Sequence, residues 1–188
     1  MKKVLVGLMI CTSLLAFGQK TSEDFQKTFT AALKVNDLVE LKQITSDWRN
    51  ELPQDPEGYI GRFNYYILEA SNIDILEEQA TGLLTSRREE LYIDSALTIL
   101  DQGLSLHPLR LDMHMGYIYV LGQHKRWQDF TPRILTLLER AKLNDFQGWL
   151  WGLDRPVGGD AKIFIIESIS DYQSMLYSEF TTERLVEI

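Results

Sequence analysis

The sequence predicts an all-α fold from three observations. The first is a repeated helix-start signal, in which a capping residue stands three positions before an acidic residue or directly before a proline. The signal occurs at Asp37 with Glu40, Asp74 with Glu77, Ser86 with Glu89, Asp55-Pro56 and Thr131-Pro132. The second is the helical spacing of apolar residues, and the third is the scarcity of the alternation typical of strands. Five helix starts in one chain are hard to reconcile with a sheet.

The first 18 residues have a composition of their own. A basic start precedes an uncharged run over 4–17, and Ala16 and Gly18 are small residues three and one positions before a cut that would follow Gly18. This combination is typical of a secretory signal peptide. We therefore expect 1–18 to be a cleaved signal peptide and 19–188 to be an exported helical-repeat domain, periplasmic or extracellular, without an integral membrane span. An uncleaved membrane anchor is the alternative, but the run is short for one.

Charge and cysteine content exclude several classes of function. Cleavage would remove two of the 19 basic residues and leave 17 against 27 acidic residues, a net charge of −10. Such a chain repels nucleic acid unless it has a basic patch, so we expect no nucleic-acid partner. Cys11 is the only cysteine and would leave with the signal peptide. The mature chain would then have no disulfide, thiol nucleophile or thiolate metal site.

The elements follow from apolar spacing, helix starts and chain breaks. We predict helices over 22–34, 37–51, 56–70, 74–84, 87–106, 110–122, 130–143, 145–151, 160–178 and 181–188. Tight turns are expected at 35–37 and 122–126. The longest irregular stretch is 154–160, where a proline and paired glycines end one helix and Asp160 can cap the next. No linker is long enough to divide the chain into two domains.

One run of residues resembles a known repeat. Ala96-x3-Leu100-x2-Gly103-x4-Pro108 is similar to the second helix of a tetratricopeptide repeat, which has small, large apolar, small and proline residues at these offsets. The resemblance is best over 92–141 and extends to 22–70. It implies antiparallel helix pairs stacked as a short tetratricopeptide-like α-solenoid, with another helical bundle as the alternative. Because Pro56 lies 52 residues before Pro108 and the family period is 34, 71–91 would be an insertion.

No set of residues indicates catalysis or metal binding. His107, His114 and His124 have neither the i,i+4 pairing nor the glutamate of a zinc-protease helix. Glu77-Glu78 and Glu89-Glu90 are sequence neighbours, which predicts solvated charge in place of two carboxylates facing one sugar. We therefore expect no catalytic residue, no metal ligand and no cofactor.

The tetratricopeptide resemblance implies a module that binds a protein or peptide. In that family the first helix of each pair lines a concave groove. If Gly61 and Gly116 mark equivalent positions, the groove would be lined by Arg62, Tyr65, Tyr66, Met113 and Tyr117. Arginine, tyrosine and methionine are enriched at interfaces. Two other functions stay open: a small exported hydrolase or carbohydrate-active enzyme with carboxylates in a helical cleft, and a structural protein that packs against an envelope assembly or its own copies.

Overall fold

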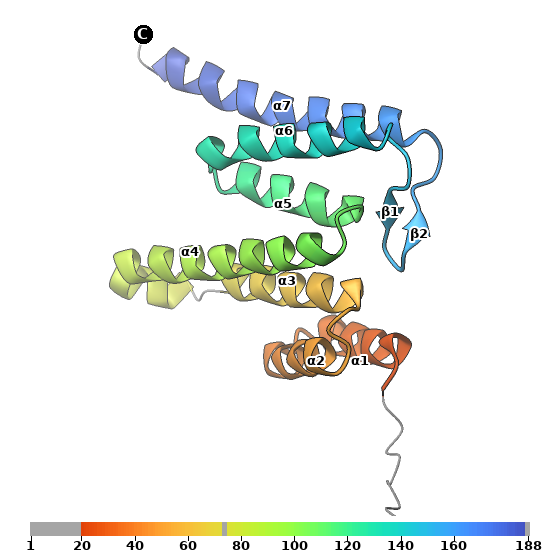
Figure 1. The fold of residues 1–188 in the computed structure, drawn as a ribbon. Helices are drawn as coiled ribbons and strands as arrows, with labels where there is room; N and C mark the ends of the chain where they lie inside the picture. Colours follow the sequence, from red (N-terminus) through yellow and green to blue (C-terminus); the bar gives the residue numbers. More distant parts are fainter. Residues whose placement is uncertain (1–19, 73–74, 187–188) are drawn as a thin grey trace, which may run out of the picture.

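The computed structural model describes residues 20–72 and 75–186, and it confirms the all-α class. The elements in chain order are α1 (Ser22–Lys34), α2 (Leu38–Glu51), α3 (Pro56–Ser71), α4 (Ile75–Leu106), α5 (Leu111–Gln123), α6 (Trp127–Leu143), β1 (Leu150–Trp151), β2 (Arg155–Pro156) and α7 (Ala161–Val186). Figure 1 shows the helices layered from α1 and α2 at one end to α7 at the other. The predicted signal peptide and the Asp74 helix start lie outside the described residues.

Neighbouring helices in the chain pack against each other. Contacts join α1 to α2, α2 to α3, α3 to α4, α4 to α5 and α5 to α6, and α5 also contacts α7. Among the described residues, no helix has both the length and the hydropathy needed to cross a membrane. The tetratricopeptide-like solenoid stays a prediction.

Several predicted helix starts and turns are confirmed. Asp37 Oδ1 accepts the N–H of Glu40 at 2.9 Å, and Asp55 Oδ1 accepts the N–H of Glu57 at 3.0 Å. Asp160 caps α7, because its Oδ1 accepts the N–H of Lys162 at 2.8 Å. These short side chains satisfy N–H groups that have no partner inside the helix. Local sequence therefore sets where these helices begin.

Three predicted boundaries are wrong. One helix, α4, occupies Ile75–Leu106, where two helices over 74–84 and 87–106 were predicted, and it runs through Ser86, so Ser86 is not a helix start. Most of the expected insertion falls in α4, which has 32 residues against the 16 of α3. The helix α6 begins at Trp127 and holds Pro132 inside it. Phe130 lies before the proline and its ring is buried, and this burial keeps the first residues of α6 helical. Likewise, the single helix α7 occupies Ala161–Val186, where two helices over 160–178 and 181–188 were predicted.

The predicted helix over 145–151 is also wrong. Asp145 and Phe146 have φ values of 51° and 58°, in the left-handed region, so the right-handed helix cannot continue through them. The chain turns there and enters a short hairpin. In this hairpin β1 pairs antiparallel with β2, with Leu150 opposite Pro156 and Trp151 opposite Arg155.

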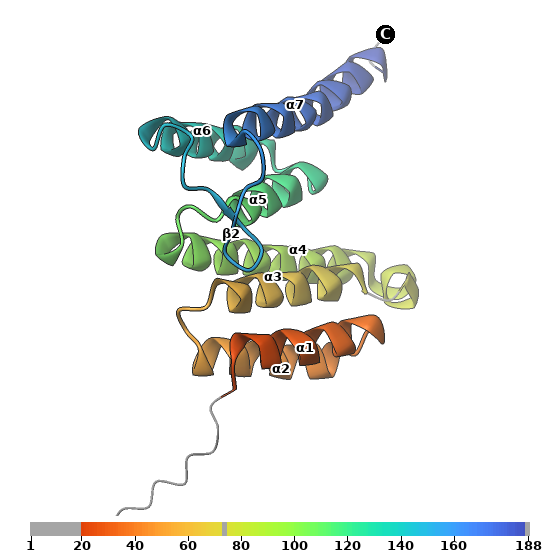
Figure 2. The same cartoon turned by 90° about the vertical axis from the view of Figure 1, so that its right-hand side faces the viewer.

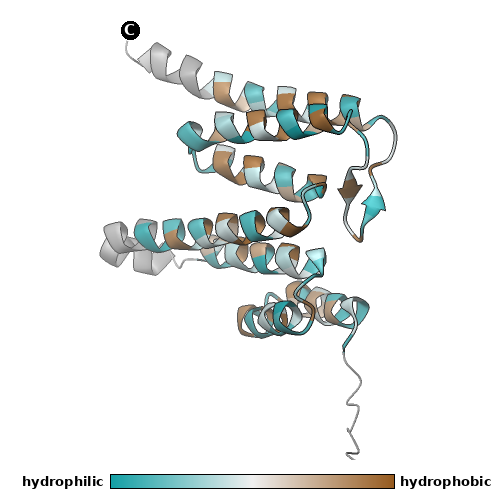
Figure 3. Ribbon diagram, viewed as in Figure 1, coloured by the Kyte–Doolittle hydropathy of each residue, from teal (hydrophilic) through white to brown (hydrophobic). Residues whose placement is uncertain are grey.

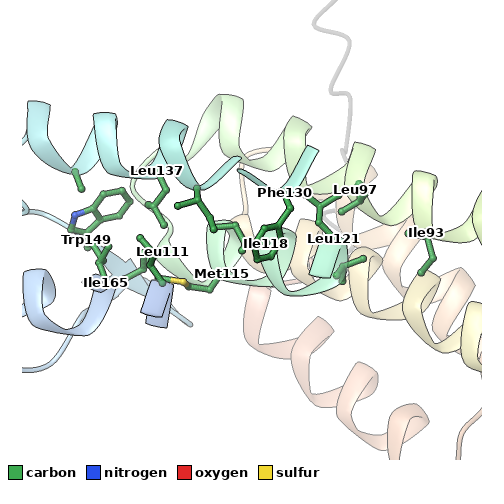
Figure 4. Close-up of a cluster of buried hydrophobic side chains, with 14 of the residues drawn as sticks. Ile93, Leu97, Leu111, Met115, Ile118, Leu121, Phe130, Leu137, Trp149 and Ile165 are labelled. Carbon is green, nitrogen blue, oxygen red and sulfur yellow. The ribbon is translucent and has the colours of Figure 1, made fainter. Parts of the chain in front are cut away.

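The core lies between the helices. Figure 3 shows apolar and polar residues alternating around the helices, as expected for helices buried on one side. The largest cluster, shown in Figure 4, joins α4, α5, α6 and α7 and includes Leu97, Ile118, Phe130, Leu137 and Ile165. Ala96 and Leu100 are buried, as the tetratricopeptide resemblance requires.

Gly103 lies where α4 packs tightly against α3 and α5. A Cβ atom added at Gly103 would lie 2.9 Å from Met113 Sδ and 3.1 Å from Tyr59 Cβ. We expect Gly103→Ala to lower the free energy of unfolding by about 1–3 kcal/mol, because overpacking outweighs the gain of about 1 kcal/mol in helix propensity. Urea unfolding measures this.

Gly61→Ala is the matched control for Gly103→Ala. A Cβ atom at Gly61 would meet its nearest neighbour at 3.5 Å, an ordinary van der Waals distance. Gly61→Ala should therefore be neutral or stabilising. Equal effects of the two substitutions would contradict the close packing at Gly103.

Candidate functional site

A buried arginine joins three elements near the beginnings of α3 and α5. The Arg110 side chain is 1% exposed, and its guanidinium donates to Glu57 Oε1 at 2.7 Å, Asp112 Oδ2 at 2.7 Å and Asp154 Oδ1 at 3.1 Å. A buried charge is tolerated only where charged or polar partners surround it. Burial alone would lower the pKa of Arg110, but the contacts with Asp112 and Glu57 outweigh it and raise the pKa above its ordinary value.

The same carboxylates hold the hairpin in place. Glu57 Oε1 accepts the N–H of Leu153 at 2.7 Å, and Asp112 Oδ2 accepts the N–H of Gly152 at 2.9 Å. At the base of the hairpin, Leu150 donates its N–H to the carbonyl of Leu109 at 2.9 Å. Figures 1 and 2 show β1 and β2 beside the ends where α3 and α5 begin. The Arg110 cluster (Glu57, Arg110, Asp112 and Asp154) therefore fastens the hairpin tip to these helices.

The tip of the hairpin has a strained backbone. Leu153 and Asp154 have φ values of 58° and 50°, in the left-handed region. For a residue with a Cβ atom this conformation costs about 1–2 kcal/mol, and it persists only where surrounding contacts hold it. Glu57 holds the N–H of Leu153, and Arg110 holds the carboxylate of Asp154. Strain of this kind concentrates at binding and catalytic sites, so the side chains on this hairpin are candidates for a functional site.

The hairpin and the first turn of α7 enclose an apolar notch. The notch has a volume of about 380 Å³ and is lined by Trp151, Arg155, Pro156, Val157, Gly158 and Phe164. The rings of Trp151 and Phe164 meet edge to face, with centroids 5.6 Å apart. They remain 38% and 37% exposed, and Leu153 at the hairpin tip is 50% exposed. Exposed apolar side chains grouped in this way mark interaction sites.

The side chains of the notch are mainly apolar. The described residues that line it offer two aromatic rings, further apolar surface and one guanidinium, and include no carboxylate, imidazole, hydroxyl or thiol. An apolar side chain can enter such a notch, and the guanidinium can contact an anionic or carbonyl oxygen. Among the residues that the structure describes, neither a nucleophile nor an acid–base pair lines the notch.

A second hollow includes Glu89 and Glu90, one of the two acidic pairs considered for catalysis. Glu89, Glu90 and Asp94 line a crevice of about 370 Å³ on α4, opposite His124 and Arg126. His124 Nδ1 lies 3.5 Å from Glu89 Oε1, and Arg126 forms ion pairs with Asp94 and Asp129. Asp94 therefore faces the cation Arg126 across the crevice, and Glu89 faces the imidazole of His124. Over the part of the chain that the structure describes, no group of His, Cys, Asp and Glu side chains is arranged to hold a metal ion.

The five residues predicted to line a concave groove occupy different environments. The structure buries Tyr65 (3% exposed) and Met113 (1% exposed) in the core. It stacks the Arg62 guanidinium 4.7 Å from the ring centroids of both Tyr65 and Tyr66. Tyr117 donates its hydroxyl to Asp101 and lies under the Arg133 guanidinium.

Arg62 also links α3 to α2. It donates to the carbonyl of Lys42 and to the hydroxyls of Thr45 and Ser46 at 3.1–3.2 Å. The structure thus brings Arg62, Tyr65 and Tyr66 together as contacts between helices. A role of these residues in binding stays a prediction.

Sequence reasoning missed the Arg110 cluster and the notch. Trp149 and Trp151 on one side of a proline- and glycine-containing stretch were the available signal, but a helix was expected over 145–151. Comparison of the chain with family models, with curated proteins and with solved structures finds no match. The candidate site therefore rests on its geometry and chemistry.

Proposed function

We propose that this chain is an exported binding module that holds a protein or peptide by taking an apolar side chain of the partner into the notch. The observation that carries the proposal is the exposed pair Trp151 and Phe164, presented by a hairpin that the buried Arg110 cluster fixes. The signal-peptide pattern of the first 18 residues supports export.

The energetics of the notch agree with this role. Covering the exposed third of each aromatic ring would contribute about 2 kcal/mol per ring at roughly 25 cal/mol per Å². Aromatic residues with contributions of this size dominate many protein interfaces. Because the hairpin is already fastened, binding does not have to order it, and less free energy is lost on association.

Loss of partner capture on truncating Trp151 tests the proposal. Tagged mature protein is crosslinked in the envelope fraction of its own cells, and the partner recovered is quantified by mass spectrometry. We expect Trp151→Ala to lower recovery at least tenfold, which corresponds to about 1.4 kcal/mol or more, with an unchanged circular dichroism spectrum.

The matched control is Tyr119→Ala, which truncates an aromatic side chain of α5 that is 50% exposed and does not line the notch. This variant should capture the partner as the original chain does. The proposal is overturned if the original chain recovers no stoichiometric partner, or if Trp151→Ala recovers as much as Tyr119→Ala.

A further inference from the structure

Arg155 is the one charged residue in the lining of the notch. Its Nε donates to the carbonyl of Gly152 at 3.0 Å, which holds the side chain against the turn. The residue is exposed, and within the described residues no carboxylate forms an ion pair with it. Its terminal nitrogens are therefore available for an oxygen acceptor brought by a partner.

The acidic residues beside the notch are already engaged. Asp154 pairs with Arg110, and Asp160 Oδ1 accepts the N–H groups of Lys162 and Ile163 at 2.8 and 3.3 Å. A chain with a net charge of −8 thus presents one cation, Arg155, in the lining of its exposed aromatic notch.

We infer that the partner segment carries an aspartate or glutamate side chain beside the apolar residue that enters the notch. The inference rests on the proposed function and adds the chemistry of the partner. A volume of about 380 Å³ suits one large side chain, and the guanidinium at its edge suits a neighbouring carboxylate in a charge-assisted hydrogen bond. Charge complementarity of this kind sets which partners are accepted.

A protein segment fits the surface better than an anionic membrane does. Aromatic rings beside basic side chains are also found where proteins contact lipid headgroups. The excess of acidic residues over the whole chain repels an anionic bilayer, whereas a short segment contacts only the notch and the Arg155 guanidinium in its lining. Membrane binding is therefore an outcome that the test must detect.

Three synthetic peptides separate the apolar contact from the charge. Each is acetylated and amidated, carries a fluorophore on a Gly-Ser spacer, and has Asp-Phe-Asp, Asn-Phe-Asn or Asp-Ala-Asp at its centre. Fluorescence polarisation gives the Kd of each with the mature chain at 50 and 500 mM NaCl. We expect Asp-Phe-Asp to bind about fivefold tighter than Asn-Phe-Asn at 50 mM and less than about twofold tighter at 500 mM. Asp-Ala-Asp should bind at least about tenfold weaker than Asp-Phe-Asp.

Arg155→Gln should abolish the difference in Kd between Asp-Phe-Asp and Asn-Phe-Asn, because glutamine has no charge that favours a carboxylate over an amide. Lys27→Gln removes an exposed cation of α1 and should preserve the difference. Equal affinities of these two peptides for the original chain, or a difference that survives Arg155→Gln, would overturn this inference and leave the apolar notch intact.

Two further outcomes distinguish a membrane partner from a failure of the notch to bind. If the chain sediments with phosphatidylglycerol vesicles, Trp151→Ala abolishes this, and no peptide binds, the partner of the notch is a membrane. That result would overturn the inference of an acidic protein segment. If Trp151→Ala does not weaken peptide binding, the notch is not the binding site, and the proposed function is overturned as well.

Discussion

Replacing Arg110 with methionine is expected to lower the free energy of unfolding by about 3–5 kcal/mol. Methionine keeps an apolar stem of similar length but removes the cation, so Glu57 and Asp112 lose their buried counter-charge. A carboxylate buried without a partner is far more costly than a well-packed neutral side chain. Urea unfolding followed by circular dichroism gives the difference.

Two further variants serve as controls for Arg110→Met. Arg155→Met makes the same replacement at an exposed site and should change the free energy of unfolding by no more than about 0.5 kcal/mol. Combining Arg110→Met with Glu57→Gln and Asp112→Asn should recover part of the lost stability, because the buried charges are then gone. An Arg110→Met variant as stable as the original chain would show that the cluster does not fasten the hairpin.

The stability of the protein is expected to fall as the pH drops from about 6.5 to 4, through protonation of His114. This imidazole is buried, its Nε2 lies 3.1 Å from the carbonyl oxygen of Pro108, and its ring meets Trp149 edge to face. Burial lowers the pKa of His114 from 6.5 to about 4; Arg133 and Arg140 act in the same direction.

The direction of this pH effect follows from which state of the chain, folded or unfolded, binds the proton. Between pH 6.5 and 4 the unfolded chain protonates His114 and the folded chain does not, so acidification favours unfolding by about 1.4 kcal/mol per pH unit. The loss approaches about 3 kcal/mol and levels off below pH 4, where both states bind the proton. Above pH 6.5 this residue contributes no pH dependence.

His114→Gln isolates this effect from the titration of the carboxylates. Glutamine can still donate to the carbonyl of Pro108 but does not titrate. The difference in unfolding free energy between the original chain and His114→Gln should shift by about 3 kcal/mol between pH 7 and 4. A slope that His114→Gln leaves unchanged would contradict a buried neutral imidazole.

Local signals predicted much of the fold. Asp37, Asp55 and Asp160 cap helices because each needs only a backbone N–H two or three residues away, a relation that the sequence states directly. The boundaries that failed depend on packing between helices. Buried Phe130 keeps α6 helical before Pro132, and the left-handed Asp145 and Phe146 turn the chain where a separate helix over 145–151 was predicted.

The candidate site depends on contacts between distant residues. Arg110 lies 53 residues from Glu57 and 44 from Asp154, and Leu153 lies 96 residues from Glu57. No spacing rule connects these positions, because helix packing alone brings them together. Strands of two residues are too short to show a periodic pattern, so the hairpin that presents Trp151 was also invisible in the sequence.

Photocrosslinking at the hairpin tip tests the binding role of the notch most directly. A photoactivatable leucine analogue is placed at position 153 and, in a second protein, at the exposed position 91 of α4. Irradiation in the native cell envelope should join one partner protein to position 153 and none to position 91, and Trp151→Ala should abolish the adduct. Equal adducts at both positions, or none at 153, would contradict a partner seated on the hairpin.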